Sequence, residues 1–460
     1  MATQHPSQSA SLVPESAIIH LIKQLLTDEP SRKGMHDNTS RDALENSGDE
    51  ARQDAGCVLW DMAAVQEHAD VMADNLIFDI LLELILDMDT PDRISEISLG
   101  ILANMACHPH LQGKLAGAPR LQQAVLQALL TMDDAGCICE ACRLLSAVMA
   151  GSHVSAWLSC ITKDLGSRVT WLLEATQNSD VLERTCQLIT AIVSASSSGI
   201  QLLLGRDLLG KLKIPLEDYR CNAMASCPQQ ASEWDDAEDG CDSYPSLPAV
   251  EAVLDALEAC TEEEEGVAAM GAHTDLLQLL AQLMGPRAAL LVRGRAAVLL
   301  SILSSSGAAA IFAENADAAI LLVRFLKDAH DSEHCRVFKD AAWTLLAGAL
   351  KELQTRVGAK EKHQALQKLC SKAQDISAAA KADELEPQES TRGNFVAGML
   401  EAMCSSEPAG LQSPSGTEGD QCKLTKEQTS CEAKHRCRGD AIGRSIPCKI
   451  ATIGRSRKSP

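Results

Sequence analysis

Cysteines are the side chains of this chain whose spacing comes nearest to metal chemistry. Among the eighteen, Cys137, Cys139 and Cys142 lie within six residues, and the two-residue gap after Cys139 resembles half of a zinc clamp. A structural zinc site needs a second pair of ligands, and none follows at a standard distance. Cys142 also stands three residues before Leu145, at the place of an apolar residue in a helix. We therefore favour buried thiols in this segment over a metal site.

A second group of potential ligands lies near the C-terminal end of the sequence. It comprises Cys422, Cys431, His435, Cys437 and Cys448. Thiolate and imidazole groups are ligands that suit zinc. The gaps between these residues are irregular, however, and no two of them have Cys-x-x-Cys spacing. We favour scattered cysteines in a disordered tail over a zinc site.

Motifs of known catalytic machinery are absent from the sequence. It contains no phosphate-binding glycine loop, no HExxH, no GxSxG and no kinase signature. We therefore predict a non-enzymatic protein, with no catalytic, cofactor-binding or metal-binding residue and with no cofactor. The first residues lack the basic and apolar regions of a secretory signal, so we expect reduced thiols and a location in the nucleus, the cytoplasm or both.

The composition is that of a folded, helical and acidic chain. A hydrophobic content of 46% excludes wholesale disorder, and 3% aromatic residues argue against a large β-sandwich. The formal net charge of −22 disfavours nucleic-acid binding by the body of the chain and favours a protein partner with a basic segment. We expect no membrane span, because the uncharged stretch 296–313, which is long enough to cross a bilayer, has a Ser-Ser-Ser-Gly turn at its middle.

A helical pattern recurs along the chain and defines its architecture. Each copy is a helix rich in Leu, Ile and Ala, and one large residue marks each copy: Trp60, Leu102, Leu145, Ile189, Leu254, Leu300 and Leu345. Five of the six intervals between these anchors are 42 to 46 residues, which is the length of armadillo or HEAT repeats. Further apolar stretches with helical spacing lie between the anchors, and no stretch alternates with the period of a strand. We therefore expect two or three helices in each repeat and no sheet.

The 65-residue interval and the two ends of the chain depart from this pattern. Residues 215–246 contain eight acidic residues and one basic residue, which predicts an acidic, flexible insertion. From Asp420 onward the chain carries ten Lys and Arg against four Asp and Glu. The alternatives for this tail are an import signal, a segment that folds back on the acidic body and masks a binding groove, and a merely solubilising tail. The predicted parts are a flexible region at 1–53 with one short helix at 18–26 and a loop at 28–53, repeats at 54–214, the insertion at 215–246, repeats at 247–404 and a disordered basic tail at 405–460.

Several short blocks give the first half of the chain a family resemblance. They are Trp60-Asp61-Met62, Arg93 with Glu96-Ile97, the block GILANMAC at 100–107, Glu140 with Arg143-Leu144-Leu145, and Trp157. With them, residues 50–160 resemble the serum amyloid A-like 1 family, a group of armadillo-type proteins. The resemblance implies a non-enzymatic protein that is nuclear in animal members and linked to cell proliferation. It carries over no binding or catalytic residue.

The predicted fold is therefore all-α, an α-solenoid of about seven armadillo/HEAT-like repeats with an acidic insertion and a disordered C-terminal tail. The predicted function is that of a scaffold whose concave face binds a protein partner, and Arg93, Glu96 and Asn104 are the candidate contacts. Each of the three has a structural alternative, which is helix capping or hydrogen bonding between repeats. The alternative function is a nuclear-transport-type adaptor for basic peptides, which needs a Trp followed four residues later by Asn on successive repeats. Gly100 precedes Asn104, and Ala347 follows Trp343, so neither site has both residues.

Overall fold

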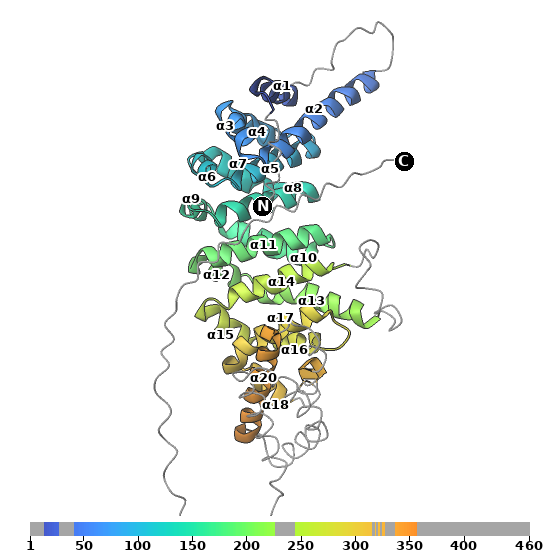
Figure 1. The fold of residues 1–460 in the computed structure, drawn as a ribbon, viewed down its shortest axis with the longest axis vertical. Coiled ribbons are helices and arrows are strands. Elements are labelled where there is room, and N and C mark those ends of the chain that lie inside the picture. The colour runs from blue at the N-terminus through green and yellow to red at the C-terminus, as the bar shows by residue number, and fades with distance from the viewer. Residues whose placement is uncertain are drawn as a thin grey trace, which may run out of the picture. The chain divides into compact units, whose positions relative to one another are not determined.

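The computed structural model describes residues 13–26, 41–225, 244–314, 318, 321–322, 324–326 and 336–356. Within these ranges the chain is built from helices and contains no strand (Figure 1). The predicted all-α fold is confirmed. None of the helices in these ranges combines the length and the apolar character needed to cross a bilayer.

The repeating unit consists of three helices, of which the first is the shortest in most units. Five such units follow one another: α3 (Gln66–Asp74), α4 (Ile77–Leu86) and α5 (Asp92–Ala106); α6 (Pro109–Ala116), α7 (Pro119–Thr131) and α8 (Ala135–Met149); α9 (Val154–Leu158), α10 (Lys163–Ala175) and α11 (Ser179–Ala195); α12 (Ser197–Leu204), α13 (Leu208–Ala225) and α14 (Leu247–Cys260); α15 (Glu264–Ala272), α16 (Thr274–Leu283) and α17 (Leu290–Ile302). A three-helix unit of this length is the armadillo type of repeat.

Elements at both ends complete the array. Helices α1 (Glu15–Leu26) and α2 (Arg41–Ala63) precede the five units. The 3₁₀ helix η1 (Leu303–Ser306), α18 (Ala308–Glu314) and α20 (Arg336–Arg356) follow them. The seven predicted anchors fall one in each of α2, α5, α8, α11, α14, α17 and α20. Six of them are buried, and the exception is Trp60, whose place in the core is taken by Leu59.

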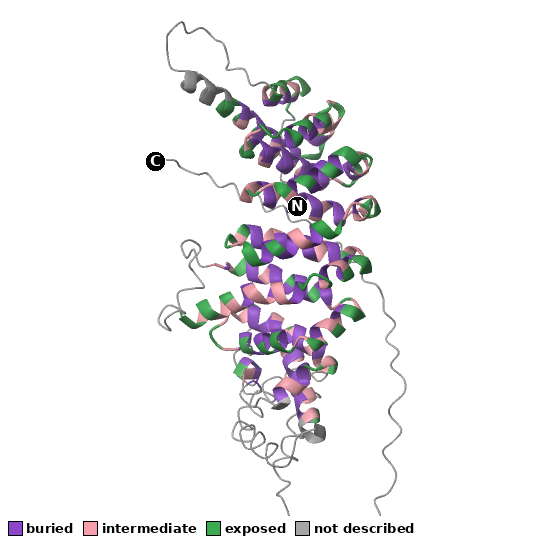
Figure 2. Cartoon of the chain, turned by 180° about the vertical axis from the view of Figure 1, so that it is seen from behind, coloured by how far each residue is buried: buried purple, intermediate pink, exposed green. Residues whose placement is uncertain are grey.

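Neighbouring units pack helix against corresponding helix. The third helices α5, α8, α11, α14, α17 and α20 contact one another in that order, and the second helices α4, α7, α10, α13 and α16 form a parallel series. Buried residues line the contacts between successive helices, whereas exposed residues gather on the short first helices and at helix ends (Figure 2). This nearest-neighbour packing is what gives a solenoid one continuous core, because no single unit can bury its own apolar face.

Three of the third helices begin at a polar N-cap residue. The side chain of Asp134 accepts a hydrogen bond from the backbone N–H of Cys137 at 2.9 Å and so caps α8. Asn178 caps α11 in the same way, and Ser246 caps α14. Short polar residues of this kind are the preferred N-caps, since they supply acceptors to N–H groups that have no partner inside the helix. The caps help to fix where these three helices begin.

The predicted N-terminal region is correct for its first helix and wrong for the loop after it. The expected short helix is α1, and its Ile18, Ile22 and Leu25 are buried. The expected loop at 28–53 is helical from Arg41 onward, as part of α2. No apolar period marks this stretch, but Arg, Ala, Leu, Glu and Gln make up most of it, and the buried Arg52 donates from Nε to the carbonyl oxygen of Leu25 at 2.8 Å. Contact with α1 therefore supplies the packing that the sequence does not reveal.

The predicted acidic insertion begins later than expected. Residues 215–225 belong to α13, which contains Pro215 within it. Pro215 and Leu216 are buried, and the hydroxyl of Tyr219 accepts a hydrogen bond from the N–H of Ala289 at 3.0 Å. Burial of this helix face outweighs the local cost of a proline inside a helix. Residues 226–243 of the insertion, the repeats predicted at 357–404 and the tail at 405–460 lie outside the described residues.

Candidate functional site

The third-helix face comprises the partly exposed side chains of α5, α8, α11, α14, α17 and α20. Two of the predicted contact residues lie on it as an ion pair, with Nη1 of Arg93 2.6 Å from Oε2 of Glu96. The guanidinium of Arg93 also lies over the ring of Trp60, 5.8 Å from its centroid. The contact with Trp60 links α5 to α2. Arg93 therefore takes part in contacts between repeats, which is the alternative to binding a partner.

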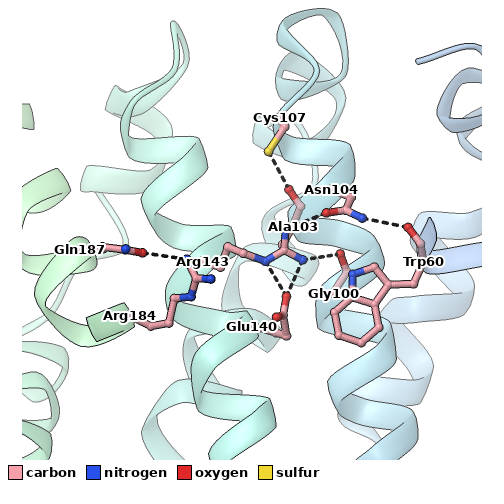
Figure 3. Close-up of polar contacts among 9 residues, drawn as sticks. All are labelled: Trp60, Gly100, Ala103, Asn104, Cys107, Glu140, Arg143, Arg184 and Gln187. Carbon is pink, nitrogen blue, oxygen red and sulfur yellow. Dashed lines mark hydrogen bonds and ion pairs between the residues drawn. The ribbon is translucent and has the colours of Figure 1, made fainter. Parts of the chain in front are cut away.

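Asn104, the third predicted contact, is held on both sides of its amide (Figure 3). Its Nδ2 donates to the carbonyl oxygen of Trp60 at 2.8 Å, and its Oδ1 accepts from Nη1 of Arg143 at 2.6 Å. Arg143 also donates to the carbonyl oxygen of Gly100 at 3.1 Å. The amide thus ties helix α2 and the third helices α5 and α8 together. Hydrogen bonding between repeats is the role that the structure gives to Asn104.

Arg143 is itself held in place by an acid on its own helix. Its Nε donates to Oε2 of Glu140 at 2.7 Å, and the side chains are 23% and 14% exposed. Burial raises the pKa of Glu140 above its ordinary value, and the charge of Arg143 acts in the opposite direction. Arg143 thus makes three hydrogen bonds to partners on α5 and α8, and its Nη2 also forms an ion pair with Oε2 of Glu140. A side chain held at so many points is poorly placed to rearrange around a ligand.

A second group of bonded polar side chains lies on α11. Nη1 of Arg184 donates to Oε1 of Gln187 at 2.9 Å, and Nε2 of Gln187 donates to Oε1 of Glu183 at 2.9 Å. Figure 3 shows Arg184 and Gln187 beside the Arg143 group. Polar side chains on this part of the third-helix face therefore find partners within the protein.

The cysteines of α8 are packed as the sequence predicts. Cys137 and Cys142 are buried, and Cys139 is half-buried. Burial raises the pKa of Cys139 and of Cys142 to about 12, so both thiols stay protonated near neutral pH. In the described part of the chain, no three His, Cys, Asp or Glu side chains are gathered as they would be around a metal ion.

A row of carboxylates on α14 is the feature that sequence reasoning missed. Glu251, Asp255 and Glu258 recur at intervals of four and three residues, so they share one face of the helix, which we call the carboxylate row. The side chains of Asp255 and Glu258 are 50% and 48% exposed. Burial raises the pKa of Glu251, and the nearby charges of Asp255 and Glu183 raise it further against the opposing effect of Arg295.

One arginine faces the carboxylate row from the next unit. Arg295 on α17 pairs with Asp255 and, at 3.1 Å, with Glu258, and its Nη1 donates to the carbonyl oxygen of Glu251 at 3.3 Å. Three carboxylates against one guanidinium leave this part of the face negative. Among the described residues the Glu251 carboxylate has no hydrogen bond, whereas the corresponding polar groups around Arg143 are all engaged. The i, i+4, i+7 spacing of the row was visible in the sequence, but its exposure was not.

Comparison with known proteins tests the family resemblance of the sequence. No protein-family model matches the chain. Protein saal1 of Danio rerio is 28% identical over 228 residues, which are 46% of this chain and 44% of that relative. Protein SAAL1 of Mus musculus is 25% identical over 169 residues, which are 36% of this chain and 34% of that relative. The resemblance to the serum amyloid A-like 1 family is confirmed. The match to these serum amyloid A-like 1 proteins spans less than half of the length of either relative.

Two engineered proteins are among the solved structures that the chain resembles. A designed armadillo repeat protein in complex with the peptide (KR)4 is 16% identical, covers 62% of this chain and 99% of its own, and has a TM-score of 0.44. Another engineered protein is 16% identical, covers 63% of this chain and 98% of its own, and has a TM-score of 0.46.

Proposed function

We propose that this chain is a non-enzymatic scaffold that binds a protein partner on its third-helix face, and that the partner contributes a basic segment. The observation that carries the proposal is the carboxylate row on α14. Glu251, Asp255 and Glu258 face one cation, Arg295, and two of the three side chains are about half exposed. Excess charge on an exposed face draws partners of the opposite sign and speeds their encounter.

The segment that precedes α14 in the sequence adds charge of the same sign. Residues 226–243, which join α13 to α14, contain six acidic residues and no basic one. The chain leaves the described structure at Ala225 and re-enters it at Tyr244, three residues before α14 begins. The linker is thus joined directly to the helix that carries the row. Both features favour a basic segment over nucleic acid or an anionic membrane.

Direct binding measurements test the proposal. A fluorescein-labelled peptide of eight lysines and arginines is titrated with the full chain, and its anisotropy is followed at several salt concentrations. Neutralising the row by Glu251→Gln, Asp255→Asn and Glu258→Gln is expected to weaken binding at least tenfold. The matched control is Glu67→Gln, Asp79→Asn and Asp89→Asn, three exposed acids in the first unit, which changes the net charge equally. Equal losses for the two triple variants would reduce the effect to net charge and contradict the proposal.

The transport-adaptor alternative receives little support. It needs asparagines at corresponding positions of successive third helices. From α5 to α20, the described third helices contain one asparagine, Asn104, and both sides of its amide are bound within the protein. We therefore keep the scaffold as the proposed function.

The location of the chain in the nucleus, the cytoplasm or both is also a proposal. It rests on the family resemblance and on the basic residues beyond Asp420. A fluorescent fusion truncated after Gln412 tests the import signal in cells. A distribution identical to that of the full chain would contradict the import signal.

A further inference from the structure

Exposed aliphatic side chains recur at one position of the last three third helices. Leu247, Leu291 and Val337 lie in the first turns of α14, α17 and α20, and they are 41%, 41% and 64% exposed. Forty-four residues separate the first two and forty-six the last two, so the spacing is that of the repeat. Single exposed aliphatic residues are ordinary on protein surfaces. A row that recurs at the repeat spacing indicates a shared surface.

Packing brings these positions side by side. Helix α14 contacts α17, and α17 contacts α20. A Cβ atom on Gly294 would lie 2.2 Å from the ring of Phe338, so the first turn of α20 rests directly on the first turns of α17. Arg295, one turn beyond Leu291, reaches the backbone of Glu251, one turn beyond Leu247. The first turns of the three helices therefore lie in register.

The solvent-facing side of α17 extends this surface. Ile302 is 40% exposed and Val298 is half-buried, and both share the helix face of Leu291 at intervals of seven and eleven residues. We call Leu247, Leu291, Val298, Ile302 and Val337 together the aliphatic patch. Its α14 side borders the carboxylate row, so the surface is acidic at one end and aliphatic at the other.

We infer that the aliphatic patch and the carboxylate row together bind one extended peptide segment of a partner protein, with basic residues over α14 and aliphatic residues over α17 and α20. This inference rests on the proposed function and adds the chemistry and register of the partner. Packed helices lie about 8–10 Å apart, and an extended chain in the polyproline II conformation rises about 3.1 Å per residue and brings every third side chain to the same side. The segment therefore presents one aliphatic side chain to each unit at intervals of about three residues.

Charge separates this occupant from the others that an aliphatic surface could accept. A second copy of the chain carries a formal net charge of −22 and would bring it to a surface bordered by three carboxylates. An anionic membrane would meet the same repulsion. A segment with basic residues beside its aliphatic ones satisfies both halves of the surface.

Three labelled peptides and two double variants test the inference. The first peptide has two arginines followed by isoleucine at every third position with serine between, the second has serine in place of each isoleucine, and the third has the same composition as the first with its isoleucines adjacent. Each is titrated into the full chain by fluorescence anisotropy. We expect the first to bind at least tenfold more tightly than the other two. Leu291→Ser with Val337→Ser should abolish that preference, whereas Val65→Ser with Leu86→Ser, two exposed residues elsewhere, should preserve it.

The outcomes separate the inference from the proposed function. Equal affinity for all three peptides, or a preference that survives Leu291→Ser with Val337→Ser, overturns the inference. Binding of the serine peptide that is lost on neutralising the carboxylate row still supports the proposed function in that case. If the intact chain is a dimer that Leu291→Ser with Val337→Ser converts to a monomer, a second copy occupies the patch and the inference is wrong.

Discussion

Two arginines at equivalent places show how the two halves of the third-helix face differ. Arg143 and Arg295 each reach back to the preceding third helix, where each binds a backbone carbonyl and the side chain four residues further on. That side chain is the neutral Asn104 for Arg143 and the charged Asp255 for Arg295. The same connection between repeats thus occurs once in a neutral setting and once in an acidic one.

The surroundings of the two arginines sharpen the difference. The acid that pairs with Arg143, Glu140, is 14% exposed, whereas the acids that pair with Arg295 are about half exposed. Around Arg143 each polar group has a partner within the protein. Around Arg295 three carboxylates share one cation. The first half of the face therefore stabilises the array, and the second half presents charge to solvent, so binding and stability should respond to mutation in different places.

The largest effect is expected in the core beneath the first half. Leu102 is fully buried, so Leu102→Asp places a carboxylate without a partner among apolar side chains, which costs about 4 kcal/mol or more and should abolish cooperative unfolding. Leu291→Asp puts the same side chain at an exposed first-turn position, where it should change stability by less than about 0.5 kcal/mol. Urea unfolding followed by circular dichroism checks both. A stable Leu102→Asp variant would mean that the buried side of α5 is misplaced.

The two arginines themselves give the next largest contrast. Arg143→Met leaves Glu140, the Gly100 carbonyl and the Asn104 amide oxygen without their donor, and we expect a loss of about 2–3 kcal/mol. Arg295→Met removes ion pairs to two acids that are about half exposed, and it should cost about 1 kcal/mol or less. Free energies of unfolding from urea titrations of the two variants measure both losses. Equal losses would remove the distinction between the two halves.

A glycine in the first half is expected to be irreplaceable for steric reasons. A Cβ atom on Gly100 would lie 2.3 Å from the ring of Trp60, so Gly100→Ala should destabilise by about 1–3 kcal/mol as α2 and α5 move apart. In α10, the nearest atom to a Cβ on Gly166 is 3.4 Å away, and Gly166→Ala should stabilise by about 0.5–1 kcal/mol. Thermal melts of the two variants should shift in opposite directions. Shifts of the same sign would contradict the packing of α2 on α5.

The smallest effect is a dependence of stability on pH. The pKa of Glu140 is raised in the folded state, so binding of a proton to this carboxyl stabilises the folded protein. This contribution to the free energy of unfolding is complete below the ordinary pKa of 4.5 and is lost as pH rises through the folded-state pKa. The loss amounts to about 1.4 kcal/mol for each unit by which the two pKa values differ. We expect Glu140→Gln to flatten this decline in urea unfolding between pH 4 and pH 8. In Arg143→Met the charge that lowers the pKa of Glu140 is gone, so the decline in stability should extend to higher pH. A pH profile of stability equal to that of the unmodified chain would exclude the coupling between Arg143 and Glu140.

The sequence predicts the array better than it predicts the site, and the reason is periodicity. Leu102, Leu145 and Ile189 recur at the repeat spacing and are buried, so the order of the repeats could be found without a structure. Pro215 and the acidic residues after it concealed the second half of α13, because burial against neighbouring helices overrides local preference.

The candidate contacts were harder to predict because the helices are rich in Ala and Leu on several sides. Asn104 stands out as a polar residue in an apolar block, which is a signal for a hydrogen bond as much as for a ligand. Its partner Arg143 lies 39 residues away, and no pattern in the sequence pairs them. The exposure of Glu251 and Leu291 likewise depends on which side of α14 and α17 meets the neighbouring units.

The most direct test of the account locates the partner on the third-helix face. A photoreactive benzoylphenylalanine is placed at Val298 on α17 or at Ala147 on α8, both of which are partly exposed on third helices. Each full-length variant is irradiated with the labelled arginine–isoleucine peptide, and the covalent product is quantified by mass spectrometry. If the peptide binds at the carboxylate row and the aliphatic patch, crosslinking occurs from position 298 and is lost when the carboxylate row is neutralised. Position 147 then gives no more than background. Crosslinking from position 147 that equals or exceeds that from position 298 would contradict the account.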